Sequence, residues 1–194
     1  MGTYRARRIA RRVVDMSTVV HEFDWPDRIV VGTVGRPGER TFYLQARAGR
    51  RVTSVALEKE QSALLAEKVD EILDQLAVRG DPTLHIPVET PAELLDDEPL
   101  DQPVEEEFRT GAIGIGWDPS TAQILLEVYP YVESDDEPDL EHAPQVLRVR
   151  MPVGTARAFA QRTRDVVRAG RPPCPLCGRP VDPDGHVCTP PDTP

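Results

Sequence analysis

Three cysteines near the C-terminus are the residues with the clearest potential for chemistry in this chain. They are Cys174 and Cys177, in the turn sequence Cys-Pro-Leu-Cys-Gly, and Cys188, which follows His186 by two positions. A Cys-Pro-x-Cys-Gly turn points backbone amides at its two thiolates and is typical of zinc sites, where four N or S ligands form a tetrahedron. Side chains two apart in an extended segment face the same side. The spacing therefore predicts a Cys3His zinc site made of Cys174, Cys177, His186 and Cys188.

Four protein ligands leave no open coordination position, so the predicted zinc is structural rather than catalytic. The chain contains no other cysteine, and every cysteine falls within ligand spacing. The pairs Cys174/Cys177 and His186/Cys188 are closer in sequence than the ligand pairs of common two-knuckle zinc ribbons. The assignment of His186 as the fourth ligand is therefore left open. The alternative interpretation is a set of incidental thiols, with one disulfide and one spare cysteine.

Composition limits the rest of the protein. With 194 residues, of which 39% are hydrophobic, the chain can bury one core plus a small appendage. Its twenty prolines and thirteen glycines indicate extensive loops. No apolar run reaches ~18 residues, so the sequence predicts neither a transmembrane helix nor the apolar part of a secretory signal. Because zinc–thiolate sites suit a reducing compartment, we expect a cytoplasmic protein with no membrane partner.

The net charge of −10 is unevenly distributed along the chain. Residues 89–141 contain seventeen Asp or Glu and one basic residue, whereas residues 148–188 contain eight arginines and three acids. Such blocks are usually solvated faces or tails. The alternative is that the acidic stretches 93–107 and 133–141 bind a basic partner or fold against the arginine-rich end.

The sequence does not predict catalysis. His21, His85 and His142 have no obvious orienting partner, and His186 is assigned to the metal. The five serines lack the context of an activated nucleophile, and a general base needs a nucleophile or a positioned substrate within hydrogen-bond reach. Carboxylate pairs occur mainly in expected loops, where a mobile acid is a poor catalyst. We therefore expect a non-enzymatic protein.

Two patterns relate to phosphate or nucleic-acid binding. The glycines at 32–38 lack the Gly-Lys-Ser/Thr ending of a phosphate loop, so they predict a hairpin or a bulge instead. A basic helix face ahead of the cysteines would suit a nucleic-acid-binding regulator; it contains Arg157, Arg162, Arg164 and Arg168. The acidic segments oppose that interpretation, because they would face the same polyanion.

Hydrophobic periodicity predicts two helices and a sheet. The helices are expected at 58–78 and 152–169, with one further helical turn at 92–95 inside a long loop. The apolar face of the first helix would consist of Leu64, Leu65, Val69, Ile72, Leu73 and Leu76. Extended runs are predicted at 18–24, 28–34, 41–46, 51–57, 108–117, 123–132 and 146–151. Short turns favour antiparallel pairing, so we predict an α+β fold: a mostly antiparallel sheet with two amphipathic helices on one face.

Two local relationships among these elements are specific enough to test. The turn Trp25-Pro-Asp27 separates the first two extended runs by three residues, which predicts that they form a hairpin. The run at 51–57 leads into the first helix as the run at 146–151 leads into the second. This parallel is consistent with a degenerate duplication.

The domain organisation follows from composition. We predict a basic N-terminal extension at 1–15, which has five arginines within its first twelve residues. An α+β domain would span 16–170 and carry acidic loops at 81–106 and 133–144, whose many acids and prolines leave little to bury. Residues 171–194 would form a zinc-knuckle tail.

Several long stretches resemble an actinobacterial family of unknown function. They are FDWPDRIVVGTVGRPGERTFYLQA at 23–46, SVALEKE at 54–60, GIGW at 114–117 and PPCPLCGRP at 172–180. One member, ParJ, is associated with the chromosome-partitioning ATPase ParA and restrains its polymerisation. The resemblance therefore implies a protein partner, a ParA-type ATPase, and it implies no catalytic residues. Members of the family begin near Met16, which implies that residues 1–15 are an extra N-terminal segment.

Two functional interpretations follow. The preferred one is a non-enzymatic cytoplasmic interaction protein with a structural zinc site, which modulates a ParA-type ATPase. Its partner surface is expected at residues 23–42 or on the acidic loops. The alternative is a nucleic-acid-binding regulator that uses the arginine-rich helix and the zinc knuckle.

Overall fold

A computed structural model describes residues 18–36, 38–79, 85–133, 143–169 and 174–177, together with residues 181, 185 and 188. The extension predicted at 1–15 lies outside these residues. So do residues 134–142, which form most of the second acidic loop, and His186 of the predicted metal set.

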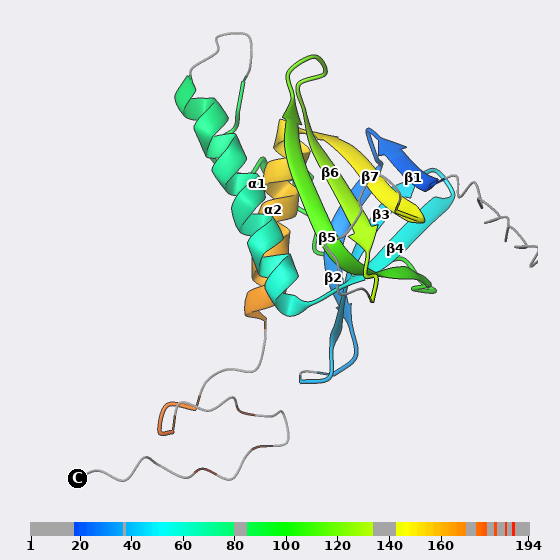
Figure 1. Ribbon diagram of the computed structural model, residues 1–194. Helices are drawn as coiled ribbons and strands as arrows, with labels where there is room; N and C mark the ends of the chain where they lie inside the picture. The colour runs from blue at the N-terminus through cyan, green and yellow to red at the C-terminus, as the bar shows by residue number, and fades with distance from the viewer. Residues whose placement is uncertain are drawn as a thin grey trace, which may run out of the picture.

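Within the described part of the chain, seven strands and two α-helices form the body of the protein (Figure 1). The strands are β1 (Val19–Asp24), β2 (Arg28–Val34), β3 (Thr41–Ala48), β4 (Arg51–Leu57), β5 (Glu106–Asp118), β6 (Gln123–Pro130) and β7 (Gln145–Pro152). The helices are α1 (Lys59–Arg79) and α2 (Val153–Arg168), and a 3-10 turn, η1 (Ala92–Leu94), lies between α1 and β5. Every element expected from the sequence is present, and its ends agree within two residues.

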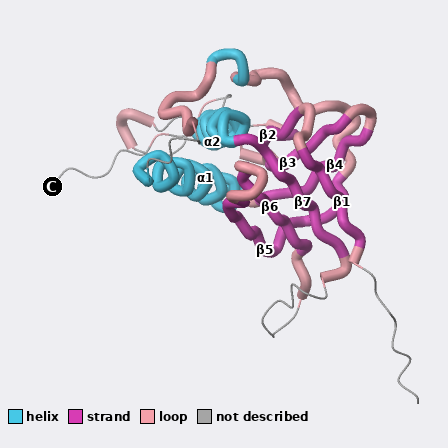
Figure 2. Tube along the Cα trace, turned by 90° about the horizontal axis from the view of Figure 1, so that it is seen from above, coloured by secondary structure: helices cyan, strands magenta, loops and turns pink. Residues whose placement is uncertain are grey.

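The strands form one mixed sheet in the order β1-β7-β6-β5-β4-β3-β2. Four neighbouring pairs are antiparallel, whereas β1–β7 and β4–β5 are parallel. Figure 2 shows that the strands curve around one side of the core and that α1 and α2 lie together on the other. The predicted α+β fold, mostly antiparallel with both helices on one face, is confirmed.

The hairpin predicted from the turn at 25–27 is wrong, because β1 and β2 do not pair with each other. β1 pairs in parallel with β7, and β2 pairs antiparallel with β3. Trp25 takes a left-handed φ of 52°, and its amide donates to the carbonyl oxygen of Arg150 at 3.1 Å. The short link therefore directs the chain from one part of the curved sheet to the other instead of folding β2 back along β1.

The two halves of the chain have the same arrangement. β5 pairs in parallel with β4 through its first residues and antiparallel with β6 through the rest. In the first half, β1 makes the parallel pair and β2 the antiparallel one, so β1, the link and β2 together correspond to β5. Each half then adds two antiparallel strands and a helix: β3, β4 and α1, or β6, β7 and α2. This order extends the strand–helix parallel that the sequence indicated.

Buried residues at matching positions support this correspondence. Phe23 of β1 lies opposite Val149 of β7, as Phe108 of β5 lies opposite Val55 of β4. Val55 and Val149 each lie four residues before the first residue of the following helix. All four side chains are buried in one core. The halves thus contribute equivalent strands to the same interior.

Each helix buries one stripe of side chains in that core. In α1 the buried hydrophobic residues are Leu65, Ala66, Val69, Leu73 and Leu76. Leu64, which the sequence placed on this face, is 54% exposed, because a helical position beside the stripe points away from the sheet. Among the described residues, no helix is long and apolar enough to cross a membrane.

Candidate functional site

The three cysteines lie together at the C-terminal end of the described chain. Their Sγ atoms all lie within 4.8 Å of one another, and those of Cys174 and Cys188 are 3.7 Å apart. Two sulfurs at 2.3 Å from a tetrahedral zinc are separated by about 3.8 Å. The cluster therefore has the spacing of adjacent ligands around one metal ion.

The local backbone favours a thiolate at Cys174. The amide of Leu176 donates to the Cys174 Sγ at 3.4 Å. Hydrogen bonds from the amides of Cys177 and Leu176 lower the pKa of Cys174 to about 6. Burial, reinforced by the neighbouring sulfurs, raises the pKa of Cys188 to about 11. A cation among the three sulfurs would supply the positive charge that the crowded thiolates need.

The structure brings together three of the four predicted ligands. Cys174 is buried, whereas Cys177 and Cys188 are half-buried. The fourth predicted ligand, His186, lies outside the described residues. The sulfur-rich set can bind a metal ion, because soft thiolate ligands suit zinc and related cations.

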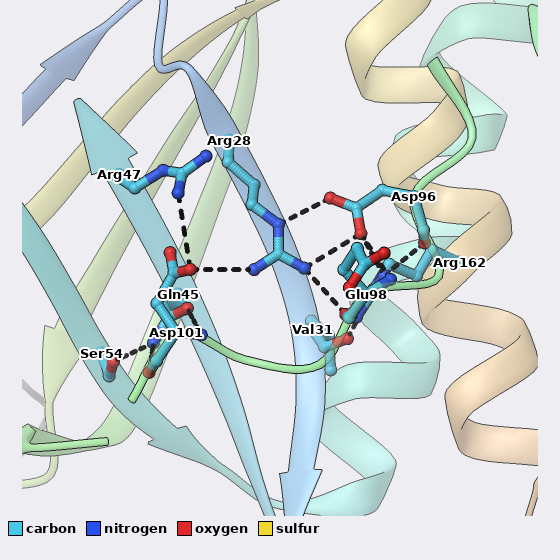
Figure 3. Close-up of polar contacts among 9 residues, drawn as sticks. All are labelled: Arg28, Val31, Gln45, Arg47, Ser54, Asp96, Glu98, Asp101 and Arg162. Atoms are coloured by element: carbon cyan, nitrogen blue, oxygen red, sulfur yellow. Dashed lines mark hydrogen bonds and ion pairs between the residues drawn. The ribbon is translucent and has the colours of Figure 1, made fainter. Parts of the chain in front are cut away.

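A second polar cluster fastens the acidic segment 85–105, called the strap below, to the body (Figure 3). Arg28 of β2 donates to both carboxylate oxygens of Asp96, with N–O distances of 2.6 and 2.9 Å. Arg162 of α2 donates to the same carboxylate at 2.6 Å. The carbonyl oxygen of Glu98 accepts from both guanidinium groups. One aspartate thus links a strand to a helix, and the hydrogen bond from Arg28 holds the pKa of Asp96 below its usual range.

The strap is also anchored by backbone and apolar contacts. The buried side chain of Gln45 accepts from the amide of Asp101 at 2.8 Å and donates to its carbonyl oxygen at 3.1 Å. Leu100 is buried against Gly32, where an added Cβ would lie 2.6 Å from the leucine side chain. The expectation that the loop at 81–106 has little to bury agrees with its described residues, because Ile86 and Leu100 are the buried hydrophobic residues of 85–105 and the other anchoring contacts are polar. The alternative prediction, that acidic residues fold against the arginine-rich end, describes Asp96 and Arg162.

Three arginines of α2 are occupied inside the protein. Arg157 donates to Asp70 at 2.8 Å and to Asp74 at 2.7 Å, both on α1. Arg164 forms an ion pair with Asp70 as well. With Arg162 bound to the strap, these contacts account for three of the four arginines that suggested a nucleic-acid surface.

Among the described residues, His21 has two polar neighbours that the sequence did not indicate, and three serines have partners other than histidine. His21 lies 3.3 Å from Gln145 and 3.6 Å from Glu107, and His85 is exposed. Three serines make structural hydrogen bonds: Ser54 accepts from Gln45, Ser62 donates to the Glu58 carbonyl oxygen, and Ser120 donates to Asp118. None of these bonds joins a serine to a histidine.

The sequence did not indicate the groove between the two helices. This groove of about 950 Å³ is lined by residues of α1 and α2, among them Ala63, Val78, Val167 and Arg168. Val78 is 88% exposed. Val78, an apolar residue outside the buried stripe of α1, was the feature of the sequence that could have indicated this groove.

The partner surface expected at residues 23–42 is less available than the sequence suggested at two positions, because Phe23 and Phe42 are buried.

The fold and the cysteine cluster define an α+β protein that is built from two similar halves. Its candidate metal site consists of three cysteines near the C-terminus. The chain belongs to the family described as "Protein of unknown function (DUF3090)", whose sequence profile matches residues 21–188. The match includes all three cysteines. No curated protein and no solved structure matches the sequence significantly.

Proposed function

We propose that this protein is a non-enzymatic interaction protein whose C-terminal segment is folded around a structural zinc ion. The observation that carries the proposal is the cluster of Cys174, Cys177 and Cys188, with sulfurs within 4.8 Å of one another. His186 is the fourth ligand in this proposal, which closes the tetrahedron and leaves no position for substrate. A short segment without an apolar core gains its fold from the metal.

The partner in this proposal is a ParA-type chromosome-partitioning ATPase in the cytoplasm. The resemblance to the family that includes ParJ supports this partner. A reducing cytoplasm supports the location, because it keeps the three thiols available for metal. The protein would change assembly of the ATPase without hydrolysing ATP itself.

Zinc content of full-length protein, purified under reducing conditions without chelator, tests the metal site. We expect one zinc ion per chain in the wild type and none in the Cys174→Ser/Cys177→Ser variant. His186→Ala should weaken zinc retention, whereas the matched control His85→Ala should retain it. Wild-type protein without metal would refute the zinc site.

Assembly of the ATPase tests the partner. Purified protein is mixed with the ParA-type ATPase of the same genome, and polymerisation and ATP hydrolysis are followed. We expect reduced polymerisation with zinc-loaded protein and a smaller effect with the Cys174→Ser/Cys177→Ser variant. Unchanged assembly and hydrolysis with zinc-loaded wild type would refute this partner while leaving the metal site intact.

The nucleic-acid alternative has less support. Arg157, Arg162 and Arg164 are held by carboxylates of the same chain. Electrostatic binding to a polyanion requires basic side chains that can reach phosphates, and it weakens steeply with salt. Absence of binding at low salt would remove this alternative.

A further inference from the structure

We infer that the cysteine cluster is a redox-controlled metal site, in which Cys174 and Cys188 form a disulfide under oxidation and thereby release the metal. This inference rests on the zinc site proposed above and adds a means of regulation to it. The Sγ atoms of Cys174 and Cys188 are 3.7 Å apart, and the Sγ of Cys177 lies within 4.8 Å of both. A disulfide requires about 2.05 Å between sulfurs, so a movement of less than about 2 Å joins them.

Because the cluster has only three cysteines, a single disulfide should be enough to release the metal ion. The chain has three cysteines, and all three belong to this cluster. One disulfide removes two of the three thiolates and leaves Cys177 as the remaining sulfur ligand. Two remaining protein ligands cannot form the closed four-coordinate site that a structural zinc requires. Oxidation of one pair therefore empties the site instead of weakening it gradually.

The location of the cluster makes it accessible and keeps the effect local. Cys177 and Cys188 are half-buried, so small oxidants in solvent can reach the sulfurs. Among the described residues, the core cluster of the body contains no cysteine. Oxidation should consequently unfold the metal-dependent segment while the α+β body remains folded.

The oxidant in this scheme is a peroxide. One of these two thiolates attacks one oxygen of hydrogen peroxide, which breaks the O–O bond, gives a sulfenic acid and releases hydroxide. The other thiolate then attacks that sulfur, forms the S–S bond and displaces a second hydroxide. The two thiolates together lose two electrons, which the peroxide gains, and zinc leaves as the hydrated ion. A dithiol reductant reverses the disulfide and restores the ligands.

The test treats zinc-loaded, full-length protein with hydrogen peroxide and follows two readouts. A chromophoric zinc chelator reports released metal, and mass spectrometry reports the thiols. We expect release of one zinc ion per chain, a mass lower by about 2 Da for one disulfide, and a peptide linkage between Cys174 and Cys188. Dithiothreitol should reverse all three changes.

Two variants, studied without metal, identify the reacting pair. Cys177→Ser retains the assigned pair and should still lose about 2 Da with the same linkage. Cys188→Ser removes that pair and should instead accumulate sulfenic or sulfinic acid. A linkage confined to Cys174 and Cys177 in the wild type would overturn the assignment, and so would retention of zinc and free thiols under peroxide.

These outcomes separate the regulation from the zinc site itself. If the reduced protein binds no zinc, the proposed zinc site fails, yet the mass readout still shows whether Cys174 and Cys188 join. If zinc binds but peroxide neither releases it nor forms the disulfide, the redox inference fails alone.

Discussion

Asp70 of α1 and Arg164 of α2 occupy the same position in the two halves of the chain and form an ion pair with each other. Each is the twelfth residue of its helix. Arg157 donates to the same carboxylate at 2.8 Å. The ion pair therefore joins equivalent positions of α1 and α2, which pack against each other.

Replacing Asp70 with Asn should therefore weaken the contact between the halves. The carboxylate is mostly buried, and its loss leaves Arg157 and Arg164 without its charge. Removing one partner of such a group should lower the free energy of unfolding by about 2–3 kcal/mol. Urea denaturation at neutral pH measures the change. Glu67→Gln, an exposed site on the same helix, is the control and should change stability by less than about 0.5 kcal/mol. Equal effects of the two variants would contradict the role of Asp70.

The sequence was sufficient for the elements because hydrophobic periodicity is a local property. The apolar run of β6 and the three-to-four spacing in α1 identified both elements within two residues at each end. Pairing is not local, which is why the turn at Trp25 was misread as a hairpin. Its left-handed φ and its hydrogen bond to Arg150 depend on a strand far away in sequence.

The cysteine cluster and the strap show the same difference between features that are local in sequence and contacts that are distant in sequence. The spacing of Cys174, Cys177 and Cys188 was enough to predict that they meet, because all three lie within one short segment. The attachment of the strap was not predictable in detail, since Asp96 is far in sequence from both of its arginine partners. Charge patterning left two alternatives for the acidic stretches: they bind a basic partner or they fold against the arginine-rich end.

Gly32 should be one of the least replaceable glycines of the sheet. A Cβ at this position would lie 2.6 Å from the buried side chain of Leu100, a residue of the strap. Gly32→Ala should displace the strap and lower the free energy of unfolding by about 2 kcal/mol. Thermal or urea unfolding measures the loss. Gly116→Ala in β5, the strand that corresponds to β2, is the matched control, because no atom lies within 4 Å of its added Cβ.

A double-mutant cycle separates the clash from other effects of the substitution. Leu100→Ala alone should destabilise the protein by leaving a cavity. Combined with Gly32→Ala, it should cost less than the sum of the two single changes, because the smaller side chain makes room for the added methyl group. Strict additivity would show that Leu100 is not the residue that excludes a side chain at Gly32.

Asp96 should make stability depend on pH. Its carboxylate is 28% exposed and is bound by Arg28 and Arg162, which are 9% and 10% exposed at the side chain. Its pKa is lowered in the folded protein, chiefly by the hydrogen bond from Arg28. The stabilisation is therefore fully present above the unfolded pKa of about 3.9 and is lost as pH falls through the lower folded value.

At neutral pH, Asp96→Asn should lower the free energy of unfolding by about 3 kcal/mol. The difference from wild type should shrink as pH falls below about 4. Urea denaturation from pH 7 downward measures both quantities. The exposed neighbour Asp97 offers the control, and Asp97→Asn should show little effect at any pH. A difference between Asp96→Asn and wild type that is independent of pH would contradict the assignment to this carboxylate.

Zinc affinity should rise with pH, because metal has to displace protons from the cysteines. Without metal, the Cys188 thiol has a pKa of about 11 and is protonated at neutral pH. Each proton released per zinc ion makes the affinity rise about tenfold per pH unit. Below the Cys174 pKa of about 6, the proton of that thiol competes as well, so the dependence should become steeper. Competition with a chromophoric chelator from pH 5.5 to about 8.5 measures the slope. The Cys174→Ser/Cys177→Ser variant gives the background of adventitious binding, and a wild-type slope equal to that background would place the metal elsewhere.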